Sequence, residues 1–216
     1  DAAAGAPSHS IHLKPLAEDA LSLPVRTGKA RVIGIEPASL VTKSLVREVK
    51  TDDAGCFQSA LNPGLTKIAV IERHKRTGKL GIGILEGYGL TGGAIATTIS
   101  HDSHNIVVAG DNDPDMLLAV RELADMGGGI VSVHGGAIRR LPLPIAGLMT
   151  SADPQEVNAV LHDMLVAARA ELGIPEDVEP FMTLSFMALP VIPELKLTAR
   201  GLFNVNTFSF VGVEAD

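Results

Sequence analysis

The sequence predicts an α+β fold, in which a mixed, largely antiparallel β-sheet carries helices packed on one face. Short runs of β-branched and aliphatic residues, separated by glycine and proline, outnumber the segments with helical periodicity. A turn at Thr77-Gly78 joins two such runs, as in an antiparallel hairpin. Only two helices are firmly indicated, which excludes an eight-fold βα barrel of about 250 residues.

The expected strands are short and follow one another with few interruptions. Strand-like pieces occur between residues 25 and 49, and residues 51–66 have the Asp, Asn, Pro and Gly content of a loop. We expect further strands over residues 67–74, 80–85, 94–99, 106–109, 130–133, 182–188 and 202–211.

Two helices are indicated by a cap followed by apolar residues at helical spacing. The first begins with Asp113 as the cap and Pro114 at the first helical position, where proline lacks only an N–H that would be unpaired anyway. The second begins at Asp153-Pro154. Its apolar residues repeat every three or four positions, at Val157, Val160, Leu161, Met164, Leu165, Ala168 and Leu172.

The composition excludes several classes of function. The chain has 216 residues, with 18 Lys and Arg against 25 Asp and Glu, so its net charge of −7 argues against nucleic-acid partners. A single cysteine, Cys56, cannot form an internal disulfide, which fits the reducing cytoplasm. No apolar run reaches about 18 residues, so we expect no membrane-spanning segment.

The first 24 residues differ in composition from the rest. They are rich in Ala, Gly, Pro and Ser, and we expect residues 1–24 to form a flexible leader or linker before a domain over 25–216. The first residue is Asp1 rather than Met, which favours a piece of a longer protein.

The densest polar cluster is Ser100-His-Asp-Ser-His-Asn105, which we place at a strand end or connecting turn. A histidine beside a carboxylate suits proton transfer near neutral pH, so His101, Asp102 and His104 are candidate catalytic residues. They could also supply at most three metal ligands. The alternative is a polar loop whose side chains pair with the backbone.

A second polar group lies at the end of the first hairpin strand. Glu72 and His74 share one face there if the strand continues through them. They either contribute to the same cleft as residues 100–105 or form a charged hairpin end in solvent. The glycines of the return strand, Gly81 and Gly83, match no phosphate-binding pattern and favour close backbone packing.

Four blocks resemble, in order, the C-terminal region of bacterial adenine deaminases, which belong to the amidohydrolase superfamily. They are residues 67–74 (KIAVIERH), 93–108 (GAIATTISHDSHNIVV), 141–149 (LPLPIAGLM) and 184–196 (LSFMALPVIPELK). The resemblance runs from about residue 25 to residue 211. It implies hydrolysis of adenine to hypoxanthine and ammonia in purine salvage.

The resemblance also implies a divalent metal, manganese or iron, in an N-terminal barrel. No His-x-His pair of such a barrel can be matched, so we expect no metal ligand in this chain and no activity of the chain alone. The implied partners are adenine, the barrel domain and further copies in a homo-oligomer. Supporting roles fall to His101, Asp102 and His104, with Ser100, Ser103, Asn105, Glu72 and His74 as substrate-binding candidates.

Two other functions remain open. The domain could be a scaffold that completes a subunit interface or covers the barrel mouth, as its Pro-rich apolar segments 141–149 and 189–197 suggest. It could also be a small metal hydrolase built on His101, Asp102, His104 and Glu72.

Overall fold

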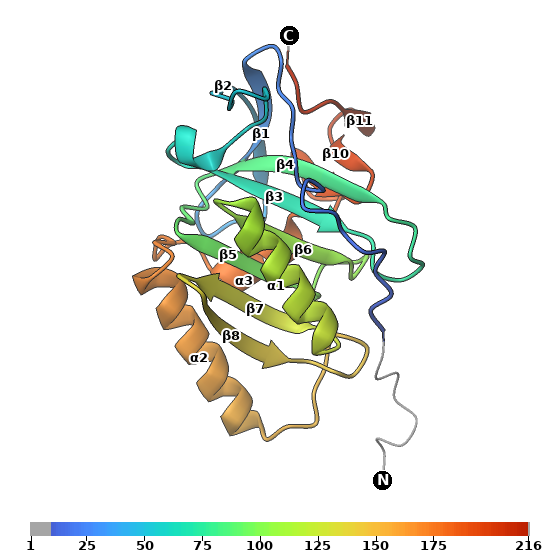
Figure 1. Cartoon of the computed structure of the whole chain (residues 1–216), viewed down its shortest axis with the longest axis vertical. Coiled ribbons are helices and arrows are strands. Elements are labelled where there is room, and N and C mark those ends of the chain that lie inside the picture. The colour runs from blue at the N-terminus through green and yellow to red at the C-terminus, as the bar shows by residue number, and fades with distance from the viewer. Residues whose placement is uncertain (1–9, 216) are drawn as a thin grey trace.

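A computed structural model describes residues 10–215, which form a large sheet and a small sheet with helices around them (Figure 1). The strands of the large sheet are β1 (Lys29–Ile35), β2 (Thr42–Glu48), β3 (Leu65–Ile71), β4 (Leu80–Glu86), β5 (Gly93–Thr97), β6 (Ile106–Gly110), β7 (Gly129–His134) and β8 (Ala137–Pro142). A short 3₁₀ turn, Ser59–Leu61, precedes β3.

The large sheet is mixed and mainly antiparallel, as predicted. Its spatial order is β2-β1-β4-β3-β6-β5-β7-β8, and β1 with β4 is the parallel pair. The predicted hairpin is formed by β3 and β4, with Ala69 opposite Ile82. Because β2 and β8 remain as free edges among the described residues, the sheet does not close into a barrel.

Helices cover both faces of this sheet. Helix α1 (Asp113–Asp125) packs Met116 and Val120 against Ala96 and Val108. Helices α2 (Pro154–Ala170) and α3 (Pro180–Phe186) belong to the core on the opposite face, together with the small sheet. No helix between residues 10 and 215 is long and apolar enough to cross a membrane.

The expectation of helices on one face was therefore wrong. Every residue of β5 and β6 is buried, so both sides of these central strands are apolar and each needs a cover. Ile95 and Val107 face the core that contains α2 and α3, whereas their neighbours Ala96 and Val108 face α1. The strand period of two thus divides consecutive residues between the two cores.

The segment expected as a strand over residues 182–188 is largely helix α3 instead. Glu179 caps this helix by accepting a hydrogen bond from the backbone of Met182, and Pro180 occupies the first helical position. Phe181 and Leu184, three residues apart, are buried on one side. A short apolar run fits both periodicities, and here the cap decides for the helix. In α1, likewise, the cap is Asn112 rather than Asp113.

The small sheet lies over β4 and consists of β9 (Leu195–Thr198), β10 (Gly201–Asn204) and β11 (Ser209–Val211). The single strand expected over residues 202–211 is thus a hairpin of two strands. The approach to β4 is close, because a Cβ on Gly81 would lie 2.0 Å from the carbonyl oxygen of Thr198. The glycines of β4 therefore serve backbone packing, as the sequence indicated.

The described part of the expected leader is irregular and packs against the sheet. Residues 1–9 lie outside the described residues. Leu21 and Leu23 are buried, and Nζ of Lys67 donates to the carbonyl oxygen of Leu21 at 3.0 Å. Residues 10–24 thus contribute to the core, and the domain boundary at residue 25 stays a prediction.

Candidate functional site

The polar block of residues 100–105 forms the turn between β5 and β6, as expected. The backbone N–H of His104 donates to the carbonyl oxygen of Ser100 at 2.6 Å, which closes the turn. The N–H of His101 donates to the carbonyl oxygen of Ser185 at 3.1 Å, which ties the turn to α3. The block is therefore held between the sheet and this helix.

His101 and Asp102 lie at the outer side of this turn. The His101 ring packs on Phe186 of α3, with the ring centroids 4.4 Å apart. Its Nδ1 lies 4.0 Å from Oδ1 of Asp102, whose side chain is 90% exposed. Asp102 is thus free to contact a group outside this chain, with His101 beside it.

His104 occupies the inner side of the turn. Its ring centroid lies 6.3 Å from that of His101, and its Nδ1 is buried without a hydrogen-bond partner among the described residues. Burial, followed by the positive charge of nearby Arg73, lowers the pKa of His104 below its ordinary value. The imidazole is therefore neutral at pH 7, with one nitrogen able to accept a proton.

Arg73 organises the site, although it was not a sequence candidate. It is only 1% exposed, and burial lowers its pKa. Its guanidinium donates to the carbonyl oxygens of His104 and Ala146, the latter at 3.0 Å, and to Oγ of Ser10 at 2.9 Å. One side chain thus joins three segments that are distant in sequence. Its position between Glu72 and His74 was the available signal, but charge there also fits a solvent-exposed hairpin end.

Glu72 is engaged within its own hairpin. Its carboxylate accepts hydrogen bonds from the backbone of His74, Lys75 and Thr77, and from Oγ1 of Thr77. Burial raises the pKa of Glu72, but these hydrogen bonds outweigh it and hold the pKa at about 2. His74 points to the block, because its Nε2 lies 2.8 Å from the carbonyl oxygen of Ser103.

The remaining polar candidates divide between the surface and the interior. Ser103 is exposed, and its Oγ accepts a hydrogen bond from the backbone N–H of Asn105 at 3.4 Å. Oγ of Ser100 and Oδ1 of Asn105 are buried without a partner among the described residues. Because buried polar atoms are usually paired, these atoms favour a role beyond filling a polar loop.

The geometry does not fit a metal centre. Among residues 10–215, no group of three or more His, Cys, Asp or Glu side chains could hold a metal ion. The His101 ring packs on Phe186, and the oxygens of Glu72 are taken by its hairpin. The small metal hydrolase considered from the sequence therefore gains no support.

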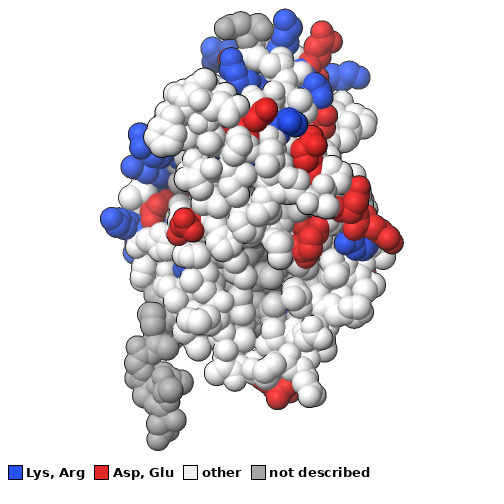
Figure 2. Space-filling model, turned by 180° about the vertical axis from the view of Figure 1, so that it is seen from behind, with Lys and Arg blue, Asp and Glu red and all other residues white. Residues whose placement is uncertain are grey.

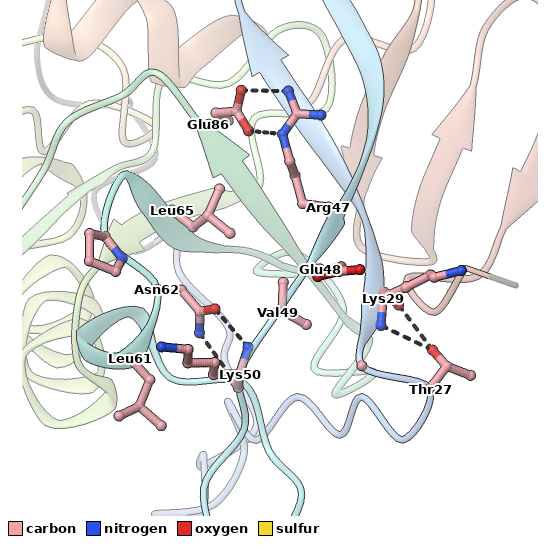
Figure 3. Close-up of a pocket in the computed structure, with 12 residues that line it drawn as sticks. Thr27, Lys29, Arg47, Glu48, Val49, Lys50, Leu61, Asn62, Leu65 and Glu86 are labelled. Atoms are coloured by element: carbon pink, nitrogen blue, oxygen red, sulfur yellow. Dashed lines mark hydrogen bonds and ion pairs between the residues drawn. The ribbon is translucent and has the colours of Figure 1, made fainter.

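A separate concavity of about 630 Å³ lies where β1, β2 and the loop before β3 meet (Figure 3). Among its charged groups, Arg47 and Glu86 pair with each other through two hydrogen bonds of 2.6 and 2.8 Å. Asn62 is held by both backbone groups of Lys50. The contacts of Arg47, Glu86 and Asn62 in this concavity are therefore structural.

Comparison with known proteins identifies the family. The model of the adenine deaminase C-terminal domain matches residues 39–209. This chain belongs to that family. The adenine deaminase of Nitratidesulfovibrio vulgaris (strain Hildenborough) is 58% identical over 205 residues, which cover 94% of this chain and 35% of the relative. That of Clostridium acetobutylicum is 44% identical over 205 residues, covering 94% and 36%. Adenine deaminase 2 of Carboxydothermus hydrogenoformans is 47% identical over 206 residues, covering 95% and 36%.

The adenine deaminase C-terminal domain thus accounts for most of this chain, and the chain spans about a third of the length of these relatives. The family match contains the turn of residues 100–105, Arg73 and all three helices. Strand β1 and the arm of residues 10–24 precede the matched region, although both pack into the same cores.

Proposed function

We propose that this chain is the C-terminal part of an adenine deaminase, which hydrolyses adenine to hypoxanthine and ammonia in cytoplasmic purine salvage. The family match over residues 39–209 carries this proposal, together with relatives named adenine deaminase. The divalent metal of the enzyme, manganese or iron, is held by the part of the enzyme outside this chain. The chain alone is then inactive.

In this proposal the turn of residues 100–105 lies at the edge of the adenine site. Asp102 is the exposed carboxylate, and His101 lies close enough to exchange a proton with it through one water. His104 is held neutral behind them, which suits a hydrogen-bond acceptor near a reaction that moves protons. These three residues support the reaction rather than hold the metal.

The substrate-binding role falls to the polar groups around these residues. Adenine offers an amino donor and a ring-nitrogen acceptor on one edge, which hydroxyl, amide and imidazole groups can pair. Ser100, Ser103 and Asn105 supply such groups in the turn, and His74 supplies an imidazole beside it. Glu72 acts indirectly, by fixing the loop that carries His74.

A hybrid enzyme tests the proposal. In it, this chain replaces the matching region of the Nitratidesulfovibrio vulgaris adenine deaminase, to which it is 58% identical. We expect the hybrid to release hypoxanthine from adenine, and the purified 216-residue chain to release none. Hypoxanthine production by the chain alone, free of host enzyme, would contradict the proposal that the chain is inactive without the rest of the enzyme. A hybrid that folds but is inactive would contradict the proposed function.

Variants of the hybrid test the individual residues. His101→Ala, His104→Ala and Asp102→Ala should each lower kcat/KM by about tenfold, which is less than the roughly 10²–10⁴-fold effect of a principal acid or base because these residues only support the reaction. Asp53→Ala, in the exposed loop after β2, is the matched control and should leave kcat/KM unchanged. Unchanged kcat/KM for both histidine variants removes the supporting role.

The second candidate is a scaffold that covers the barrel mouth or completes a homo-oligomer. An apolar groove between α2 and α3 favours it. A scaffold predicts that the histidine variants keep full activity, whereas substitutions in the groove alter sedimentation or thermal stability of the hybrid.

A further inference from the structure

An apolar groove of about 430 Å³ lies beside the turn of residues 100–105. It runs between α2, α3 and the end of β5, and its lining is Thr97, Ile99, His101, Ile130, Leu161, Glu179, Phe181, Met182, Ser185 and Phe186. The carboxylate of Glu179 caps α3 through the backbone of Met182. Apart from that capped carboxylate and His101, the groove has no ionisable side chain in its lining.

The surface around the groove is also poor in charge. From behind, the lowest part of the molecule shows few charged side chains, whereas the upper part carries many (Figure 2). Met182, which lines the groove, is 57% exposed, and Val160, next to Leu161 of the lining, is 38% exposed. Exposed apolar side chains gathered around a groove mark a surface that binds another protein part.

Helix α2 leaves part of its apolar stripe accessible. Its buried residues are Met164, Ala167 and Ala168, whereas Val157, Leu161 and Leu165 are only partly buried against the same core. Val160, in the first half of the helix, is 38% exposed, and Leu161 lines the groove. An apolar stripe that its own domain covers only in part indicates a second contact on the same helix.

The N-terminal end of the described chain is connected to the turn of residues 100–105 through Arg73. Ser10 accepts a hydrogen bond from Arg73, which also donates to the carbonyl oxygen of His104. His104 lies beside His101, whose ring packs on Phe186 at the groove. In the relatives, about two thirds of the chain lies outside the matched C-terminal region. Ser10 is therefore linked through Arg73 to the turn of residues 100–105, which borders the groove.

We infer that the groove between α2 and α3 is the surface on which the preceding two thirds of an adenine deaminase chain docks, with Met182 and Phe186 as apolar contacts. This inference rests on the proposed function. It adds the surface and its residues, and it places His101 at the boundary between the two parts of the enzyme. The buried Oγ of Ser100 lies one residue from that boundary.

Hydroxyl-radical footprinting tests the inference by measuring side-chain accessibility. Met182 should label at least fivefold less in the hybrid enzyme than in the purified chain, because the docked part covers it. Phe208, which is 76% exposed on the β10–β11 turn, is the reference and should label equally in both proteins. Met116, a fully buried residue of α1, gives the unreactive baseline.

A pair of matched variants adds a second measurement. Met182→Glu should lower the Tm and kcat/KM of the hybrid, whereas Val46→Glu, on the edge strand β2 at 51% exposure, should change neither. Both positions are exposed, so both variants of the purified chain should fold with unchanged Tm.

Three results would overturn the inference. The first is equal labelling of Met182 in the hybrid and in the purified chain. The second is an effect of Met182→Glu on the hybrid that is no larger than that of Val46→Glu. The third is labelling of Met182 in the purified chain that decreases as the concentration of the chain rises, which would assign the groove to a second copy of this chain. The footprint does not need activity, so a hybrid that makes no hypoxanthine but protects Met182 contradicts the proposed function and not the docking surface.

Discussion

The buried guanidinium of Arg73 donates through Nε to the backbone carbonyl oxygen of His104, from a strand end to the turn of residues 100–105. The same group reaches the carbonyl oxygen of Ala146 and the backbone and side chain of Ser10. No carboxylate of residues 10–215 lies within ion-pair distance of it. Arg73 therefore acts as a rigid fork of donors that aligns backbone segments.

Replacing Arg73 should loosen these segments. Arg73→Met leaves the carbonyl oxygens of His104 and Ala146 without their donor, and an unpaired buried acceptor costs about 1–3 kcal/mol. We expect the free energy of unfolding, measured by urea denaturation, to fall by about that amount. Arg121→Met, at an exposed position on α1, is the control. Equal stability of the two variants contradicts the role given to Arg73.

The hydrogen-bonded carboxylate of Glu72 should make stability depend on acid. Its pKa is about 2 in the folded chain, against an ordinary value of 4.5. A pKa lowered by folding stabilises the chain above the unfolded value, and that contribution is lost as the pH falls from about 4.5 towards 2. Glu72→Gln should therefore have a lower Tm than the natural chain at pH 6, with the difference vanishing near pH 2.

Glu48→Gln provides the comparison for this experiment. Glu48 is exposed on β2, and no hydrogen bond to its carboxylate occurs in the described structure. Its variant should follow the natural chain over the whole pH range. A constant difference in Tm between Glu72→Gln and the natural chain from pH 6 to pH 2 would count against the assigned hydrogen bonds.

The backbone conformation of His104 should make the stability of the chain depend on which residue replaces it. Its φ is +47°, in the left-handed region that glycine and asparagine tolerate and β-branched residues do not. His104→Val should therefore be less stable than His104→Asn by about 1–3 kcal/mol in urea denaturation. The same pair at His162, inside α2, should differ much less, because helical backbone accepts both residues. Equal stability of the two His104 variants would rule out this conformation.

Gly81 should not tolerate a side chain. A Cβ there would lie 2.0 Å from the carbonyl oxygen of Thr198, so Gly81→Ala must push the small sheet away from β4. Overpacking of this kind typically costs about 1–3 kcal/mol. At Gly212, where a Cβ would come no closer than 3.6 Å to Glu214, alanine should be nearly neutral. Circular dichroism melts of both variants measure the difference, and a Gly81→Ala melt equal to the natural one would refute the close contact.

Sequence patterns with long or punctuated signals predicted their elements well. The β3–β4 hairpin is confirmed, because its two aliphatic runs flank one short turn. Helix α2 begins at its Asp153 cap as expected. Residues 182–188 were misassigned, since seven mostly apolar residues carry too little periodicity to separate helix from strand.

The candidate site was predicted unevenly for a physical reason. The polar run at residues 100–105 was visible because six consecutive polar residues cannot continue a half-buried strand. The importance of Arg73 was not visible, because its three hydrogen-bonding partners lie 31, 63 and 73 residues away along the chain. Only folding brings those carbonyl groups around one guanidinium.

By itself, the sequence determined the α+β class, the mainly antiparallel pairing, the turn that holds His101 and Asp102, and the family resemblance. These features depend on local periodicity, turn chemistry and identity along the chain. The tertiary structure alone decided that helices cover both faces, that Arg73 is buried and that the apolar stripe of α2 is only partly covered. The physical reason is that burial depends on which surfaces meet in space, and residues distant along the chain supply the opposing surface.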